Sequence, residues 1–280
     1  MNNEKRIIRF EKNGPADTGM PAIELDRADF QSALPEQHLH VYFEDEALGL
    51  SAGVWTTTDM QETFGPYPGD EFMWLLEGQV DMIDADGNTT HVKPGETFYI
   101  RNGIPISWKQ VGFLRKFYMT YDNPNAQTPD ISSADGGVLI LDPAALQSGM
   151  TEMDNTEPLV IEGEAPLQHD NVAFTNDAGN MFVGMWDSME FESEMRPFPW
   201  HEFVQLLEGE ITITQGDGTI HQFSAGDAFF IPEGTICSWK NSGYVKKRYS
   251  IVEILIYLRF SVAWSQSRSR CRPERSVAWS

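Results

Sequence analysis

The sequence matches itself without a gap when it is shifted by 131 residues. Of the 84 positions in the segment 35–118, 28 carry the same residue as the equivalent position in the segment 166–249. Random pairing would give roughly a fifth of that number of identities, given average amino-acid usage. We therefore predict two copies of one domain joined head to tail, at residues 30–122 and 161–253.

Two further segments precede the two copies. Residues 1–29 form an N-terminal extension whose IIRF stretch we expect either to add an edge strand or to wrap around the partner domain. Residues 123–160 form a connector, in which the polar stretch 122–137 is rich in turn-forming residues and predicts a loop. The stretch 138–150 then predicts a strand and a short helix that begins near Asp142, because the Pro that follows is favoured in a first helical turn.

The end of the chain has no counterpart after the first copy. Residues 254–280 carry five Arg and one Glu, which leaves a net charge of −26 for the rest, and they contain SVAWS twice. A basic interaction tail is one interpretation. We favour a non-native-looking or disordered tail, such as a frameshift or read-through would leave, and exclude it from the fold prediction.

The net charge excludes some classes of partner. The chain carries 20 Lys and Arg against 42 Asp and Glu, for a net charge of −22. Such a surface repels nucleic acid and anionic membranes, and its simplest role is to keep the protein in solution. We see no run of about 18 apolar residues and no apolar core of a signal peptide near the start. Two cysteines cannot build a disulfide framework, so we expect a cytoplasmic protein.

The pattern within each copy is that of strands and tight turns. The segment EFMWLLEGQVDMIDADGNTTHV predicts three strands, with a hairpin turn at Asp86-Gly87 between the second and the third. The second copy keeps this turn at Asp217-Gly218. Asp-Gly between alternating strands is a strong hairpin signal. Many short strands at this spacing predict an all-β fold in which each copy closes into a sandwich or barrel.

Several motifs in both copies resemble those of the cupin family. Glu71 is followed after six residues by Gly78, and Glu202 likewise by Gly209, as in the first cupin motif. The second copy also resembles the second motif, with Cys237 where that motif has His. The resemblance implies two tandem cupin barrels of the double-stranded β-helix, or jelly-roll, type. The combination of PxPxxEF, LLEG and SWK is similar to the ureidoglycine aminohydrolase-type class of cupins.

The resemblance also raises the question of a metal. A typical cupin site holds Mn, Fe, Ni or Zn with three His and one Glu, but neither copy has His at the His-x-His positions. Glu202, Cys237 and His169 are the candidate ligands of a divalent transition metal in the second barrel. His38 and His169 occupy equivalent positions, and a hydrogen-bonded structural role is the simpler interpretation of both.

The strand pattern predicts which side chains face the two cavities. Glu71 and Glu202 are candidate general acids or bases, or partners of structural ion pairs with Lys. Cys237 is a candidate nucleophile or a small buried hydrophobe, and Arg196 is a candidate clamp for a substrate carboxylate or a solvated surface residue. The remaining candidate substrate-binding residues are Tyr67, Trp108, Lys116 and Tyr118 in the first copy and Phe198, Trp239, Lys247 and Tyr249 in the second.

Three classes of function remain open. The first is an enzyme that hydrolyses a C–N bond of a small polar metabolite with Glu202 as acid or base, as the resemblance implies. The second is a non-catalytic or regulatory protein that binds a small organic molecule. The third is a metal-dependent oxygenase or lyase. The second barrel is favoured as the active one because His201, Cys237 and Asn241 occur only there. Pairing through edge strands would give a homodimer.

Overall fold

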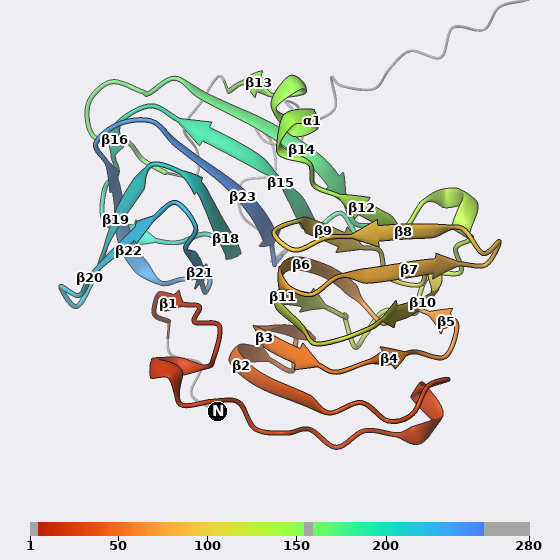
Figure 1. The fold of residues 1–280 in the computed structure, drawn as a ribbon. Coiled ribbons are helices and arrows are strands. Elements are labelled where there is room, and N and C mark those ends of the chain that lie inside the picture. Colours follow the sequence, from red (N-terminus) through yellow and green to blue (C-terminus); the bar gives the residue numbers. More distant parts are fainter. Residues whose placement is uncertain (1–4, 154–158, 255–280) are drawn as a thin grey trace, which may run out of the picture.

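The computed structural model describes residues 5–153 and 159–254. The fold is all-β, as predicted, and consists of two barrels, each made of a large and a small antiparallel sheet (Figure 1). The predicted tail 254–280 lies outside the described residues except for its first residue. None of the described helices is long and apolar enough to cross a membrane.

The first barrel comprises residues 37–121 together with one strand from the connector. Its large sheet has the order β12-β9-β6-β11-β3-β2, and its small sheet the order β4-β10-β7-β8, with β5 paired to β10. The strands are β2 (Gln37–Asp45), β3 (Leu50–Thr57), β4 (Met60–Gln61), β5 (Gly65–Pro66), β6 (Asp70–Glu77), β7 (Val80–Asp84), β8 (Thr89–Val92), β9 (Thr97–Ile100), β10 (Pro105–Gln110), β11 (Leu114–Tyr121) and β12 (Val138–Ile140).

The second barrel repeats this arrangement. Its large sheet has the order β1-β21-β18-β23-β15-β14-β13, and its small sheet the order β16-β22-β19-β20, with β17 paired to β22. The strands are β1 (Ile8–Arg9), β13 (Thr151–Glu152), β14 (Gln168–Thr175), β15 (Met181–Ser188), β16 (Phe191–Glu192), β17 (Arg196–Pro197), β18 (His201–Glu208), β19 (Glu210–Gln215), β20 (Ile220–Ser224), β21 (Ala228–Ile231), β22 (Ile236–Asn241) and β23 (Val245–Val252).

The predicted Asp-Gly turns join the hairpins of the small sheets. Gly87 lies between β7 and β8 with φ +81°, and Gly218 lies between β19 and β20 with φ +87°. Glycine adopts this left-handed region without the steric cost that a Cβ brings. The predicted helix is α1 (Pro143–Ser148), and the Asp142 side chain caps it by accepting a hydrogen bond of 2.8 Å from the Ala145 amide.

The strand that precedes each barrel pairs with the other barrel. In the N-terminal extension, Ile8 of β1 lies opposite Phe230 of β21, and in the connector Leu139 of β12 lies opposite Tyr99 of β9. Ile8 and Leu139 are 131 residues apart in the sequence, and so are Tyr99 and Phe230. The two strand exchanges are therefore related by the same repeat as the barrels. Figure 1 shows β1 beside β21, across the molecule from the first barrel's small sheet. The IIRF stretch thus contributes an edge strand to the partner domain.

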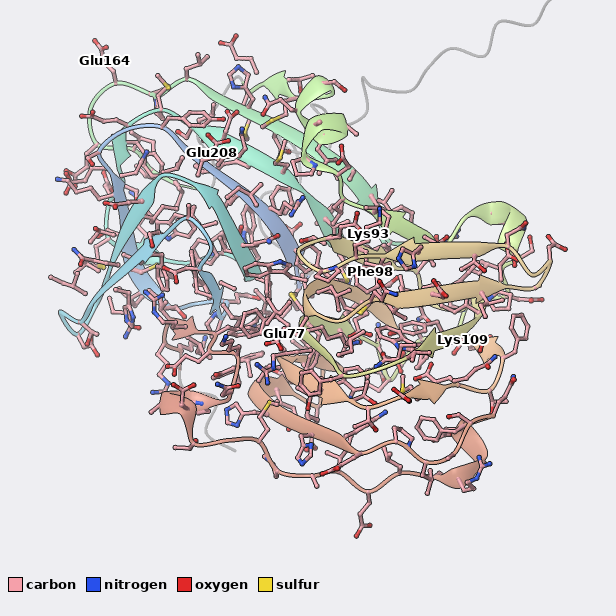
Figure 2. The ribbon with its side chains drawn as sticks, viewed as in Figure 1. Glu77, Lys93, Phe98, Lys109, Glu164 and Glu208 are labelled. Atoms are coloured by element: carbon pink, nitrogen blue, oxygen red, sulfur yellow. The ribbon has the colours of Figure 1, made fainter. Side chains whose placement is uncertain are left out.

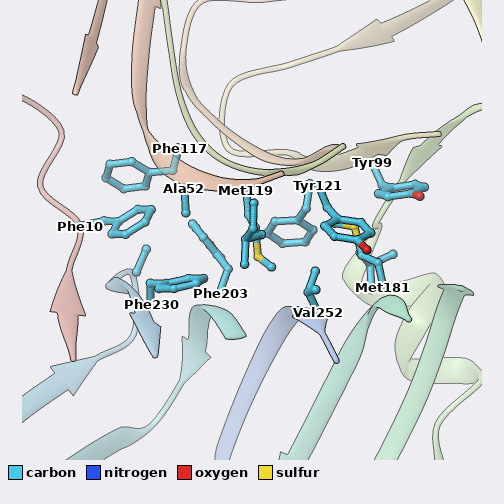
Figure 3. Packing of buried hydrophobic residues seen from close by; sticks show 14 of the residues in the cluster. Phe10, Ala52, Tyr99, Phe117, Met119, Tyr121, Met181, Phe203, Phe230 and Val252 are labelled. Atoms are coloured by element: carbon cyan, nitrogen blue, oxygen red, sulfur yellow. The ribbon is translucent and has the colours of Figure 1, made fainter. Parts of the chain in front are cut away.

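Both faces of the large sheets are buried. On β6, Phe72 points into a core shared by the two barrels and Met73 points into the first barrel, because alternate residues of a strand face opposite sides. The shared core joins Ala52 and Met119 of the first barrel to Phe203 and Val252 of the second (Figure 3). Charged side chains such as Glu164 lie on the outside (Figure 2).

Phe10 links the N-terminal strand to both barrels. Its ring stacks on Tyr42 at 4.7 Å and meets Phe117 and Phe203 edge to face at 5.4 and 5.1 Å, and the side chain is only 5% exposed. Phe10→Ala should lower the free energy of unfolding by about 3 kcal/mol, because it leaves a cavity between the barrels. Urea denaturation followed by fluorescence measures this change. Phe113→Ala at an exposed position is the control, and a loss below about 1 kcal/mol for Phe10→Ala would contradict the role of the strand.

Candidate functional site

Each barrel contains a buried ion pair between its central strands. In the first barrel, Lys116 of β11 donates to Glu71 of β6 at 2.8 Å, and in the second Lys247 of β23 donates to Glu202 of β18 at 2.6 Å. All four side chains are at most 10% exposed. The sequence predicted both carboxylates and both lysines as inward-facing residues, and the structure pairs them in each barrel.

Two tryptophan rings enclose each ammonium group. The Nζ atom of Lys116 lies 4.9 Å from the ring centroid of Trp55 and 4.8 Å from that of Trp108. Lys247 repeats these contacts with Trp186 at 4.9 Å and Trp239 at 4.7 Å. A cation over an aromatic face is stabilised electrostatically, and more so when water is kept away. The Glu–Lys–Trp–Trp unit therefore neutralises and shields a charge in the middle of each barrel.

The two units differ in what binds the second carboxylate oxygen. In the first barrel the Tyr67 hydroxyl donates to Glu71 Oε2. Burial and the nearby negative charge of Glu71 raise the pKa of Tyr67 well above its ordinary value, so this hydroxyl stays protonated. In the second barrel Trp200 Nε1 donates to Glu202 Oε2 at 3.3 Å. The position equivalent to Trp200 is Gly69, which places no side chain in the first barrel.

A cavity of about 700 Å³ opens onto the Glu71–Lys116 pair of the first barrel. Trp108 and Tyr118, both predicted as substrate-binding residues, line it, and the Tyr118 hydroxyl lies 3.2 Å from Ser51 Oγ. The N-terminal extension supplies part of the wall through residues 23–30, which include the short 3-10 helix η2 (Arg27–Asp29). The extension therefore belongs to two sites, an edge of the second barrel and the mouth of the first.

Glu62 is an acidic lining residue that the sequence analysis missed. It lies between β4 and β5, and burial raises the pKa of its carboxyl to about 7, with the negative charges of Glu71 and Asp29 adding to the rise and Lys116 opposing it. No described residue donates a hydrogen bond to this carboxyl group. Ser193 occupies the equivalent position in the second copy. A comparison of the copies for acidic residues present in only one of them would have included it among the candidates.

The aromatic candidates of the second barrel pack on one another. Phe198 stacks on Trp239 with ring centroids 5.7 Å apart and planes 6° from parallel, and both rings are at most 4% exposed. The Tyr249 hydroxyl donates to Asp170 at 2.8 Å. The first barrel has Leu39 in place of Asp170, which leaves its Tyr118 hydroxyl to the serine described above. Phe198 and Trp239 thus form part of the packed core of the second barrel, and the Tyr249 hydroxyl is held by a hydrogen bond.

Cys237 does not have the surroundings of a nucleophile. Burial, with a smaller contribution from the charge of nearby Glu202, raises the pKa of its thiol to about 11. A reactive cysteine needs a lowered pKa. The small-hydrophobe interpretation of Cys237 therefore fits the structure, and the catalytic one does not.

Two further candidates lie away from the cavities. His169 Nδ1 lies 2.8 Å from Asp187 Oδ1, on the face of β14 opposite to the inward Gln168, whose side chain accepts from Trp186. Arg196 is 56% exposed and pairs with Glu194 at 2.7 Å. Strand alternation turns His169 outward, so it cannot join Glu202 and Cys237 in one site. Arg196 is a surface residue rather than a substrate clamp.

Comparison with known proteins agrees with this architecture. The sequence matches the EutQ-like cupin domain twice, over residues 46–118 and 175–249, which together make up more than half of the chain. The chain belongs to the EutQ-like cupin family. It is a bicupin, because the domain occurs in both halves.

Solved structures share the fold of this bicupin. A protein of unknown function from Pseudomonas syringae pv. tomato, assigned to the DUF861 family, is 24% identical, with a TM-score of 0.71 over 89% of this chain and 100% of that one. A putative glyoxylate-induced protein from Pseudomonas aeruginosa is 12% identical, with a TM-score of 0.52 over 86% and 87%. A cupin 2 barrel protein from Leptotrichia buccalis is 11% identical, with a TM-score of 0.50 over 81% and 100%. No curated protein matches the sequence.

The donor set of this bicupin does not suit a transition metal. Among residues 5–153 and 159–254, no three His, Cys, Asp or Glu side chains are grouped so that they could hold an ion. The carboxylates of Glu71 and Glu202 are each already bound to a lysine ammonium. The predicted set of Glu202, Cys237 and His169 is not assembled, because the third member faces outward.

The buried pair of the first barrel can be tested by removing one partner or both. Lys116→Met should cost about 3–5 kcal/mol in the free energy of unfolding, because it leaves the Glu71 carboxylate buried without its counter-ion. The double variant with Glu71→Gln should recover most of that loss. Urea denaturation measures both. Replacing both partners of the exposed Lys240–Glu192 pair is the control and should change the free energy of unfolding little. A loss there as large as that of Lys116→Met would contradict the special cost of breaking the buried pair.

The raised pKa of Cys237 predicts a slow reaction with thiol reagents. In a Cys271→Ser background, Cys237 is the single thiol of the chain. At pH 8 only about one molecule in a thousand carries its thiolate, so a disulfide reagent should modify it far more slowly than free cysteine. Modification should become complete in denaturant. A native rate close to that of free cysteine would restore the nucleophile hypothesis.

Proposed function

We propose that this bicupin binds a small polar metabolite in the cavity of its first barrel. The observation that carries the proposal is the combination of a cavity of about 700 Å³ with the carboxyl group of Glu62, which lines it and has no hydrogen-bond donor among the described residues. Ligand sites are typically concave, mostly apolar and supplied with a few convergent polar groups. The ligand site proposed here lies in the first barrel, whereas the differences between the two copies in the sequence favour the second.

Acid–base catalysis is a second candidate function of the same cavity. A carboxyl group with a pKa of about 7 exchanges its proton readily at neutral pH, and Glu71 and the Tyr67 hydroxyl lie in the same cavity. Hydrolysis of a C–N bond, as in ureidoglycine aminohydrolase-like cupins, needs such a group. Ammonia release from ureidoglycine that is lost in Glu62→Gln and kept in Glu164→Gln would support it. The donor set described above gives no support to a metal-dependent oxygenase or lyase.

Gly65 offers a way to close the cavity without disturbing the fold. Gly65 of β5 lies opposite Ile106 of β10, so a side chain there faces the same side as Ile106 and enters the cavity. A Cβ built at Gly65 meets nothing within 4 Å, and the backbone needs no positive φ. Gly65→Trp should therefore fill part of the cavity.

We expect Gly65→Trp to abolish ligand-induced stabilisation and Gly65→Ala to retain it. The measurement is a thermal-shift screen with small polar metabolites, in which a ligand at 100 times its Kd stabilises the folded state by about 2.7 kcal/mol. Each ligand that raises the melting temperature of the wild-type chain is then tested on the two variants. Stabilisation that survives Gly65→Trp unchanged would place the ligand elsewhere and contradict the proposal.

A further inference from the structure

The charges that line the first-barrel cavity do not balance. The charged lining side chains are three carboxylates, those of Asp29, Glu62 and Glu71, and one ammonium, that of Lys116. Lys116 contacts the Glu71 carboxylate at 2.8 Å, Met73 Sδ at 3.1 Å and its two tryptophan neighbours, and it makes no ion pair with Glu62. Glu62 is left as a half-buried acid without a counter-ion among the described residues.

A half-buried acid without a partner can be neutralised in two ways. It can hold a proton, which burial favours by raising the pKa to about 7, or it can bind a cation. An anionic ligand would have to lose its water beside Glu62 and Glu71 without gaining a free cation, which is strongly unfavourable. A ligand with N–H donors on a positively charged nitrogen gains charge-assisted hydrogen bonds to the carboxylate instead.

We infer that the first barrel takes a small organic cation, an ammonium or guanidinium compound, with Glu62 as its counter-ion. The inference rests on the proposed function and names its ligand class. Aromatic side chains such as Phe30, Tyr67 and Tyr118 line the cavity and suit the apolar body of such a ligand. The net charge of −22 over the whole chain also raises the local concentration of cations.

The cation and the proton compete for the same carboxyl group. The charged groups that face Glu62 are Lys116 of β11, Glu71 of β6 and Asp29 of η2, and the Tyr67 hydroxyl, which stays protonated, also lies nearby. With a pKa of about 7, the charged fraction of Glu62 rises from about one tenth at pH 6 to about nine tenths at pH 8. Affinity for a cation should therefore rise about tenfold over this interval. A ligand that accepts a hydrogen bond from the protonated acid would show the opposite trend.

Three test ligands of similar shape separate the ligand classes. Methylguanidinium, N-methylurea and propionate are titrated against the full chain at pH 6 and pH 8 by ligand-detected NMR. We expect methylguanidinium to bind most tightly and about tenfold more tightly at pH 8. Tighter binding of N-methylurea or propionate, or an affinity for methylguanidinium that does not rise with pH, would overturn the inference.

Variants tie the binding to Glu62. Glu62→Gln should weaken methylguanidinium binding at pH 8 at least tenfold and remove its pH dependence, whereas Glu62→Asp, which keeps the charge, should retain it. Glu164→Gln removes an equal charge from an exposed position and should leave binding unchanged. An unchanged affinity in Glu62→Gln would overturn the inference.

Gly65→Trp distinguishes failure of the inference from failure of the proposed function. If N-methylurea or propionate binds best and Gly65→Trp blocks it, the cavity remains a ligand site and the cation inference fails. If none of the three ligands shows binding that Gly65→Trp blocks, the inference fails and the metabolite screen described above decides the proposed function independently.

Discussion

The burial of both faces of the large sheets is the constraint on which the structure depends. Each large sheet lines its own barrel with one face and the shared core with the other, so neither barrel could bury its apolar surface alone. The strands β1 and β12 complete this arrangement. β1 precedes the first barrel but pairs with the second, and β12 precedes the second barrel but pairs with the first. Phe10 shows the consequence most directly, since a residue near the start of the chain packs between the two halves.

Within this frame the two barrels share a charged centre and differ around it. The Glu–Lys–Trp–Trp unit occurs in both, with distances that agree within a few tenths of an ångström. A unit that recurs in both copies with the same contacts is best explained as part of the stable core. The differences carry the functional information: the second barrel has Trp200 and Ser193 where the first has Gly69 and Glu62.

These differences change the electrostatics of the first barrel. A small residue at position 69 leaves the Glu71 carboxylate next to a cavity, and the acid at position 62 adds a charge that the barrel does not compensate. In the second barrel the indole of Trp200 takes the free carboxylate oxygen, and Ser193 accepts a backbone hydrogen bond from Trp239. One repeated sequence thus produces a neutral core in one place and an unbalanced polar cavity in another.

The sequence alone determined the repeat, the all-β class, the two barrels, the hairpin turns and the inward lysines and carboxylates, because strand alternation and turn chemistry are local. The tertiary structure alone decided which candidates share a site. The His169 side chain contacts Asp187. Glu62, which lies between the short strands β4 and β5, lines the cavity of the first barrel. The first outcome depends on the pairing of β14 with β15, which sets His169 opposite Asp187, and the second on the path of the N-terminal extension, which forms part of the cavity wall around Glu62; no sequence spacing relates the residues that these contacts bring together.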